Sequence, residues 1–198
     1  MKIKVVTVGM LQANCYLVYD EKTMEALVID PGAEGEKIRR ELGQLGLKVK
    51  LIVNTHGHFD HVGANEFVRH ATGAALFIHE EDDALMQEET NGAPDGYLHD
   101  GDTLEVGSLH FSVLHTPGHT KGGVCLVGEG VCFTGDTLFA GTIGRTDLPG
   151  GSLNEMMSSL QTKLAPLPDA VVIFPGHGPQ STMGREKAGN PYLSQVTE

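Results

Sequence analysis

Apolar residues at the start of the chain come in short runs that are interrupted by glycine, proline and charged residues. Runs rich in β-branched residues that end at turn-forming residues are typical of strands. They predict three strands, at Lys2–Val8, Cys15–Tyr19 and Ala26–Asp30. Strands that follow one another this closely favour a small antiparallel sheet at the N-terminus.

Further along the chain, apolar positions at helical spacing alternate with strand-like runs. Helices are predicted at Glu34–Leu45, His61–Ala71, Glu80–Glu89 and Leu153–Leu164, with a short last helix from Arg185. Strands are predicted at Leu47–Val53, Thr103–Val106, Leu109–Leu114, Gly123–Val127, Val131–Thr134 and Ala170–Phe174. The segment Thr90–Asp100 contains glycine, proline and asparagine and is expected to form a loop. Because strands occur in both halves without strict β-α alternation, we expect an α+β fold of two packed sheets covered by helices.

Composition narrows the class of protein. With 198 residues, 40% of them hydrophobic, the chain can build one sizeable core, and we expect a single domain over residues 1–198. A formal net charge of −12 disfavours a nucleic-acid partner. The N-terminal apolar stretch is broken by Gln12, Asn14 and Asp20, so neither a signal peptide nor a membrane span is expected. Three cysteines without a C-x-x-C pair indicate no thiolate zinc site, and a cytoplasmic location is expected.

The densest group of chemically active side chains follows the apolar run Leu51–Val53. It consists of His56, His58, Asp60 and His61. In a loop that leaves a strand, two of these histidines can converge on one cation while the Asp and the third His turn toward a second. A solvated loop with a helix-capping aspartate would explain one such residue, but not four in six positions. Nitrogen and oxygen ligands suit zinc, iron or manganese.

The same local design recurs three more times, as an apolar run, a glycine-containing turn and a residue able to bind metal. The three residues are His119 in HTPGHT, Asp136 in TGD and His177 in PGHG. Each alone would be an ordinary turn. All are expected at strand ends, where rigid strands position the loops that carry function. Together with the first cluster they provide enough ligands for two metal ions.

In this order, the segments THGHFDH, TPGHT, FTGD and FPGHG resemble the signature of the metallo-β-lactamase fold, from about Val5 to the end of the chain. The stretch LFAGTIGRTDLPGG after Asp136 is most similar to the glyoxalase II (hydroxyacylglutathione hydrolase) type, in its short bacterial form. The resemblance implies an αββα sandwich, with two mixed sheets flanked by helices. It also implies two divalent metal ions, zinc foremost, with His56, His58 and His119 on the first, Asp60, His61 and His177 on the second, and Asp136 bridging both.

A two-metal site would lower the pKa of a bridging water from 15.7 toward about 7 and so produce a hydroxide nucleophile, which Asp60 would orient. A thioester suits such a site, because its thiolate leaving group has a pKa of about 8.5 and departs with little acid assistance. The expected substrate is S-D-lactoylglutathione or a related hydroxyacyl-thiol adduct. Arg145, in the glycine-rich loop after Asp136, is expected either to bind a substrate carboxylate or to pair with Asp147.

Other functions share much of this pattern. A related group, the persulfide dioxygenases, also has the GRTD stretch and uses one iron on residues that correspond to His56, His119 and Asp136. A lactonase would share all seven ligands. A true β-lactamase is disfavoured, because the resemblance gives Asp136 a bridging role that those enzymes lack. A metal-binding module without catalysis is the non-enzyme alternative, although three ligands per metal and a shared carboxylate leave positions for water and substrate.

Overall fold

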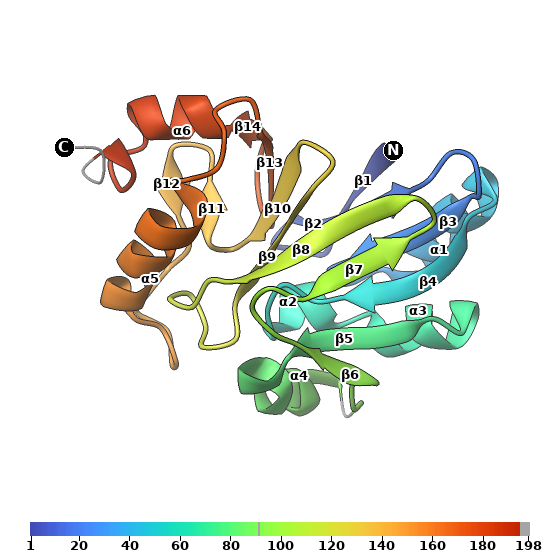
Figure 1. Cartoon of the computed structure of the whole chain (residues 1–198). Coiled ribbons are helices and arrows are strands. Elements are labelled where there is room, and N and C mark those ends of the chain that lie inside the picture. Colours follow the sequence, from blue (N-terminus) through green and yellow to red (C-terminus); the bar gives the residue numbers. More distant parts are fainter. Residues whose placement is uncertain (91, 195–198) are drawn as a thin grey trace.

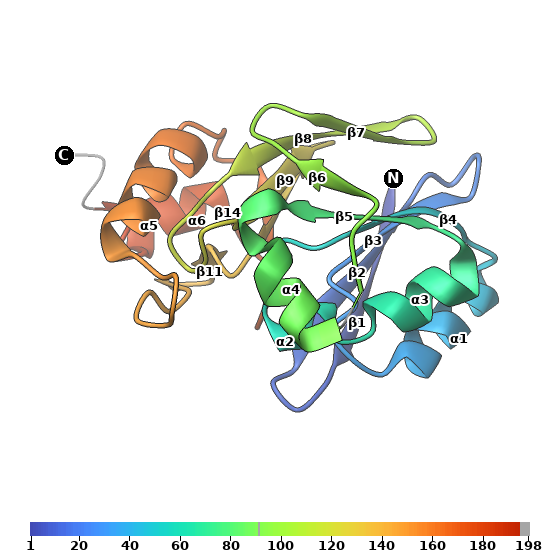
Figure 2. The same ribbon diagram turned by 90° about the horizontal axis from the view of Figure 1, so that it is seen from below.

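Two six-stranded sheets lie face to face, and helices cover the outer side of each sheet (Figure 1, Figure 2). The computed structural model describes residues 1–90 and 92–194. This arrangement is an αββα sandwich, which confirms the predicted α+β class and its two mixed sheets. Helices α1–α4 lie against the first sheet, and α5 and α6 lie against the second (Figure 2).

The first sheet has the strand order β1-β2-β3-β4-β5-β6. Its strands are β1 (Lys2–Val8), β2 (Ala13–Tyr19), β3 (Glu25–Ile29), β4 (Lys48–Val53), β5 (Ala75–His79) and β6 (Gly96–Leu98). The first three are antiparallel as predicted, but they form one side of a larger mixed sheet, because β4, β5 and β6 add in parallel. The sequence pattern did not predict β5, and β6 lies in the segment expected as a loop, of which residue 91 is outside the described residues.

The second sheet has the order β14-β13-β10-β9-β8-β7. Its strands are β7 (Thr103–Val106), β8 (Leu109–His115), β9 (Val124–Gly128), β10 (Val131–Gly135), β13 (Val172–Pro175) and β14 (Ser181–Thr182). All neighbours are antiparallel except β10 and β13. A separate small hairpin, β11 (Leu138–Phe139) with β12 (Thr142–Ile143), follows β10.

The helices are short. They are α1 (Gly35–Leu45), α2 (Phe59–Val62), α3 (Asn65–Thr72), the 3₁₀ turn η1 (Glu80–Asp82), α4 (Asp83–Thr90), α5 (Leu153–Ser159) with the π-helical η2 (Leu160–Leu164), and α6 (Met183–Gly189). The helix predicted at His61–Ala71 is wrong as a single element, since the chain forms α2 and α3 instead. The break occurs where the Ala64 amide donates to the Pro31 carbonyl at 2.9 Å, so the chain bends toward the loop after β3. No helix among the described residues is long and apolar enough to span a membrane.

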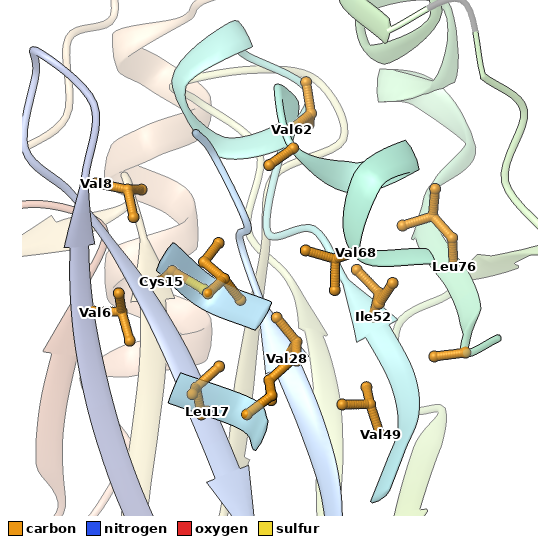
Figure 3. Close-up of a cluster of buried hydrophobic side chains, with 14 of the residues drawn as sticks. Val6, Val8, Cys15, Leu17, Val28, Val49, Ile52, Val62, Val68 and Leu76 are labelled. Atoms are coloured by element: carbon orange, nitrogen blue, oxygen red, sulfur yellow. The ribbon is translucent and has the colours of Figure 1, made fainter. Parts of the chain in front are cut away.

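The core has three layers of buried apolar side chains. One layer lies between the first sheet and its helices, and Figure 3 shows part of it, with Cys15, Val28 and Ile52 close together. A second layer fills the space between the sheets, and a third lies between the second sheet and α5, η2 and α6. The middle layer is rich in aromatic rings, which pack edge to face or offset at centroid distances of 5.1–6.1 Å. The middle layer fixes the two sheets against each other.

Substitution of Phe133, on β10, tests how much the middle layer contributes to stability. Its fully buried ring lies 5.1 Å from the Tyr16 ring and 5.4 Å from the Phe174 ring. Phe133→Ala is expected to lower the free energy of unfolding by about 3–5 kcal/mol, because it leaves a cavity between the sheets. Chemical denaturation of the metal-free protein measures this loss, and Phe133→Leu, which keeps most of the apolar volume, should lose less. A loss below about 1 kcal/mol for Phe133→Ala would contradict this account of the core.

Candidate metal centre

The first group of ligand residues joins loops from both sheets. His56 and His58 lie in the loop after β4, and His119 lies in the loop after β8. One nitrogen from each lies within 4.8 Å of the others, and Nδ1 of His58 is 2.9 Å from Nε2 of His119. The Nε2 atom of the buried His56 has no hydrogen-bond partner. A buried polar atom without a partner is costly, so this nitrogen favours a bound cation.

The second group lies directly beside the first. Asp60 and His61 belong to α2, and His177 follows β13. Nε2 of His177 is 3.1 Å from Oδ2 of Asp60 and 3.2 Å from Nε2 of His61. These three side chains again offer one atom each within 4.8 Å. The structure therefore brings together five histidines and one aspartate, six of the seven residues that the sequence resemblance assigns to two metals.

Asp136, directly after β10, faces both groups. Its Oδ2 is 3.5 Å from Nε2 of His119 and 3.6 Å from Nε2 of His177. Its Oδ1 is buried without a hydrogen-bond partner, 3.4 Å from Nε2 of His61. A carboxylate between two sets of three nitrogen and oxygen donors fits a pair of divalent cations.

A buried carboxylate that the sequence analysis missed supports the second group. Asp30, 1% exposed, accepts hydrogen bonds from the Thr55 amide at 2.7 Å and the Thr55 hydroxyl at 2.6 Å. Its Oδ2 is also 2.9 Å from Nδ1 of His61. Asp30 lies close enough to His56 and His61 to form a third group of potential ligands. Its oxygens, however, already accept hydrogen bonds from Thr55 and His61. We therefore assign it a supporting role, which fixes the Nδ1–H tautomer of His61 and leaves Nε2 free.

Backbone carbonyls orient two further histidines in the same way. Nδ1 of His119 donates to the Arg145 carbonyl at 2.7 Å, and Nδ1 of His177 donates to the Leu11 carbonyl at 3.1 Å. In each ring the other nitrogen, Nε2, then points toward the remaining donors and is available to a cation once it carries no proton. The loops after β1 and β12 thus take part in the site through their backbones.

Residues next to the donor groups along the chain or through their carbonyls carry exposed side chains. The Arg145 guanidinium binds the Asp147 carboxylate through two contacts, Nε to Oδ1 at 3.0 Å and Nη2 to Oδ2 at 2.8 Å. This is the pairing considered from the sequence, and both side chains are exposed. Beside the second group, Leu11 and Phe59 are more than half exposed.

The two groups differ in their affinity for protons. Burial and the neighbouring His61 lower the pKa of His56 well below its usual value. Burial disfavours a charged His61 as well, but the carboxylates of Asp136 and Asp30 outweigh it and raise the pKa of His61 to about 9. The hydrogen bond with Asp60 likewise raises the pKa of His177. The second group therefore holds a proton at neutral pH when no metal is bound.

The profile of the Metallo-beta-lactamase superfamily matches residues 8–177, from the end of β1 to the last candidate ligand. The chain belongs to the metallo-β-lactamase superfamily. Among curated proteins it is similar to "Hydroxyacylglutathione hydrolase GloC" of Haemophilus influenzae, with 38% identity over 98% of this chain and 99% of that protein.

Two solved structures show the same superfamily fold. "BLEG-1 B3 metallo-beta-lactamase" is 36% identical, with a TM-score of 0.91 over 98% of this chain and 100% of that chain. "ETHE1 from Myxococcus xanthus" is 30% identical, with a TM-score of 0.85 over 98% of this chain and 85% of that chain. Structures this similar carry different functional names, so the fold alone does not decide the reaction.

Metal binding by this superfamily member is expected to depend on pH differently at the two groups. Protonation of His61 stabilises the metal-free protein below about pH 6.5, and this contribution is lost as pH rises through about 9. A cation must displace that proton, so the zinc affinity of the second group should rise with pH up to about 9. Chelator competition from pH 6 to 9 measures this in His58→Ala, which keeps the second group. In His177→Ala, which keeps the first group, the zinc affinity should stop rising at a lower pH. Identical dependence of zinc affinity on pH in the two variants would contradict the assignment of the bound proton to the second group.

Proposed function

We propose that this superfamily member is a two-metal hydrolase that cleaves a small thioester, with S-D-lactoylglutathione or a related hydroxyacyl-thiol adduct as substrate. The observation that carries the proposal is the presence of two complete donor groups that share Asp136. Three ligands per cation and a carboxylate shared between the two cations leave positions for water and substrate, whereas a structural zinc site is closed by four ligands of its own. Similarity to a protein named hydroxyacylglutathione hydrolase supports the choice of substrate.

When bound, the cations would supply a water that is deprotonated near neutral pH and would polarise the substrate carbonyl. Asp60 has the properties needed to orient that water. Burial disfavours its charge, but the hydrogen bond with His177 and the nearby His61 and His177 rings together outweigh burial and lower the pKa of Asp60 below its usual value. Its carboxylate is therefore ionised at neutral pH, and it is only partly buried beside the two donor groups.

The leaving group limits the substrate class. A thiolate, with a pKa of about 8.5, can depart without a proton, whereas an amide nitrogen needs an acid. The exposed side chains near the donor groups would suit a substrate with both apolar and charged parts: the Leu11 carbonyl binds His177, Phe59 precedes Asp60, and the Arg145 carbonyl binds His119. A glutathione thioester carries carboxylates that the Arg145 guanidinium could bind.

A persulfide dioxygenase is the principal alternative, because the GRTD stretch is present and the chain is 30% identical to ETHE1 of Myxococcus xanthus. Such an enzyme needs only His56, His119 and Asp136, yet Asp60, His61 and His177 are all in place as a second group. The second group therefore favours the hydrolase. The similarity to a structure named a B3 metallo-β-lactamase makes β-lactam hydrolysis a reaction to test, and a lactonase would share the same ligands.

These functions are separated by testing purified protein loaded with zinc or with iron. Hydrolysis of S-D-lactoylglutathione by the two-metal form, exceeding turnover of a lactone and of a chromogenic cephalosporin, is the expected result. Oxygen uptake with glutathione persulfide by a form that contains one iron would overturn the proposal in favour of a dioxygenase. Metal binding without any of these reactions would favour the binding module.

Asp60→Ala is expected to reduce kcat for thioester hydrolysis by at least about 100-fold, because the attacking water loses its orienting carboxylate and the second group loses a ligand. Initial rates measured alongside metal content check this. Asp169→Ala, which removes an exposed carboxylate paired with Lys187, is the matched control and should keep full activity. Equal kcat in the Asp60 variant and the wild type would rule out the proposed mechanism.

Arg145 can be tested against its partner Asp147. If Arg145 binds a substrate carboxylate, Arg145→Ala should raise KM for a glutathione thioester by about tenfold or more, with a smaller change for an uncharged thioester. Asp147→Ala would then leave the Arg145 guanidinium in place, and KM should stay close to the wild-type value. If the pair only stiffens the loop, both variants should change KM to the same extent for both substrates.

A further inference from the structure

Asp82 is a buried carboxylate in an unexpected place. It ends η1, within the acidic run Glu80–Asp83, which as a sequence is typical of a solvated helix start. Its side chain points inward instead, and the residue is only 1% exposed. A buried charge is retained only where it makes strong interactions, so its partners indicate its role.

Each oxygen of Asp82 accepts a backbone hydrogen bond from a different loop. Oδ2 accepts from the Gly57 amide at 2.9 Å, and Oδ1 accepts from the Gly122 amide at 2.7 Å. Gly57 lies between His56 and His58, and Gly122 lies three residues after His119. One carboxylate therefore connects the loop after β4 of the first sheet with the loop after β8 of the second. These two loops provide the whole first group of candidate ligands.

The two loops also pack tightly against the backbone of Asp82. A Cβ atom added to Gly57 would lie 2.8 Å from the Asp82 carbonyl oxygen, and one added to Gly122 would lie 2.7 Å from the Asp82 amide nitrogen. Side chains do not fit at such distances, so both loops need glycine where they meet Asp82. Hydrogen bonding and packing thus identify the same contact point independently.

We infer that Asp82 is a positioning residue that holds the His56–His58 loop and the His119 loop at the spacing required by the first metal. The Nδ1 of His58 and the Nε2 of His119 lie 2.9 Å apart, on loops with no covalent connection nearby. The carboxylate also places a negative charge close to the expected cation, which favours binding electrostatically. The inference rests on the proposed metal centre, but it holds for any substrate.

Asp82→Asn tests the inference with almost no change in volume. The amide keeps one acceptor oxygen, but it directs an NH₂ donor at one of the two backbone amides and removes the charge. Asp82→Asn is made in two backgrounds. In His177→Ala only the first donor group is intact, and in His58→Ala only the second donor group is intact. Zinc affinity is measured by chelator competition. Asp82→Asn should weaken zinc binding about tenfold in the His177→Ala background and leave it unchanged in the His58→Ala background.

Asp20 provides a matched control at the opposite end of the first sheet. It is also buried, and it accepts from the backbone amides of Lys22 and Ser108, both at 2.9 Å, so that it links the β2–β3 turn to the β7–β8 turn. Asp20→Asn should lower the free energy of unfolding as Asp82→Asn does, because both leave a buried amide unsatisfied. It should not alter zinc affinity in either background. This separates positioning of the metal ligands from general destabilisation.

Gly122→Ala is a second variant that keeps every charge. Its methyl group would press against the Asp82 backbone and displace the His119 loop, so it should weaken zinc binding by the first group alone. Unchanged affinity in both Asp82→Asn and Gly122→Ala would overturn the inference, as would an equal loss in Asp20→Asn. A wild type that binds no metal at the first group would refute this role together with that part of the metal centre. Metal binding at the first group with an unaffected Asp82 variant would refute only the role of Asp82, and loss of the second metal alone would refute the two-metal function but not this role.

Discussion

The close approach of imidazole nitrogens is the constraint around which the metal centre is built and which the surrounding structure must maintain. Nδ1 of His58 lies 2.9 Å from Nε2 of His119, Nε2 of His61 lies 3.2 Å from Nε2 of His177, and Nε2 of His56 has no hydrogen-bond partner. Lone pairs this close together repel one another unless a proton or a cation lies between them. Two divalent cations would relieve the repulsion at all of these atoms.

The scaffold holds these nitrogens in place through groups that do not touch the metals. Asp30 anchors His61, and the carbonyls of Leu11 and Arg145 anchor His177 and His119. The aromatic layer between the sheets fixes the strands from which the ligand loops emerge. Rigid strands and a second layer of hydrogen bonds together give a site that is organised before metal binds.

The sequence predicted the sandwich and the seven clustered residues, because strand periodicity and the motifs HGHFDH, PGHT, TGD and PGHG are local signals. It did not predict strand β5 (Ala75–His79), which is short and is stabilised by pairing with a distant strand rather than by its own pattern. It also missed the supporting roles of Asp30 and Asp82. Asp30 looked like the end of a strand and Asp82 like a solvated helix start, and only their burial and long-range partners distinguish them.

The central claim is that both donor groups bind metal, with Asp136 between them. Zinc content of the purified, zinc-saturated protein, compared with that of His177→Ala, tests it most directly. The wild type is expected to bind about two zinc ions per chain and the variant about one. A single metal ion in the wild type, unaffected by loss of His177, would contradict the two-metal centre.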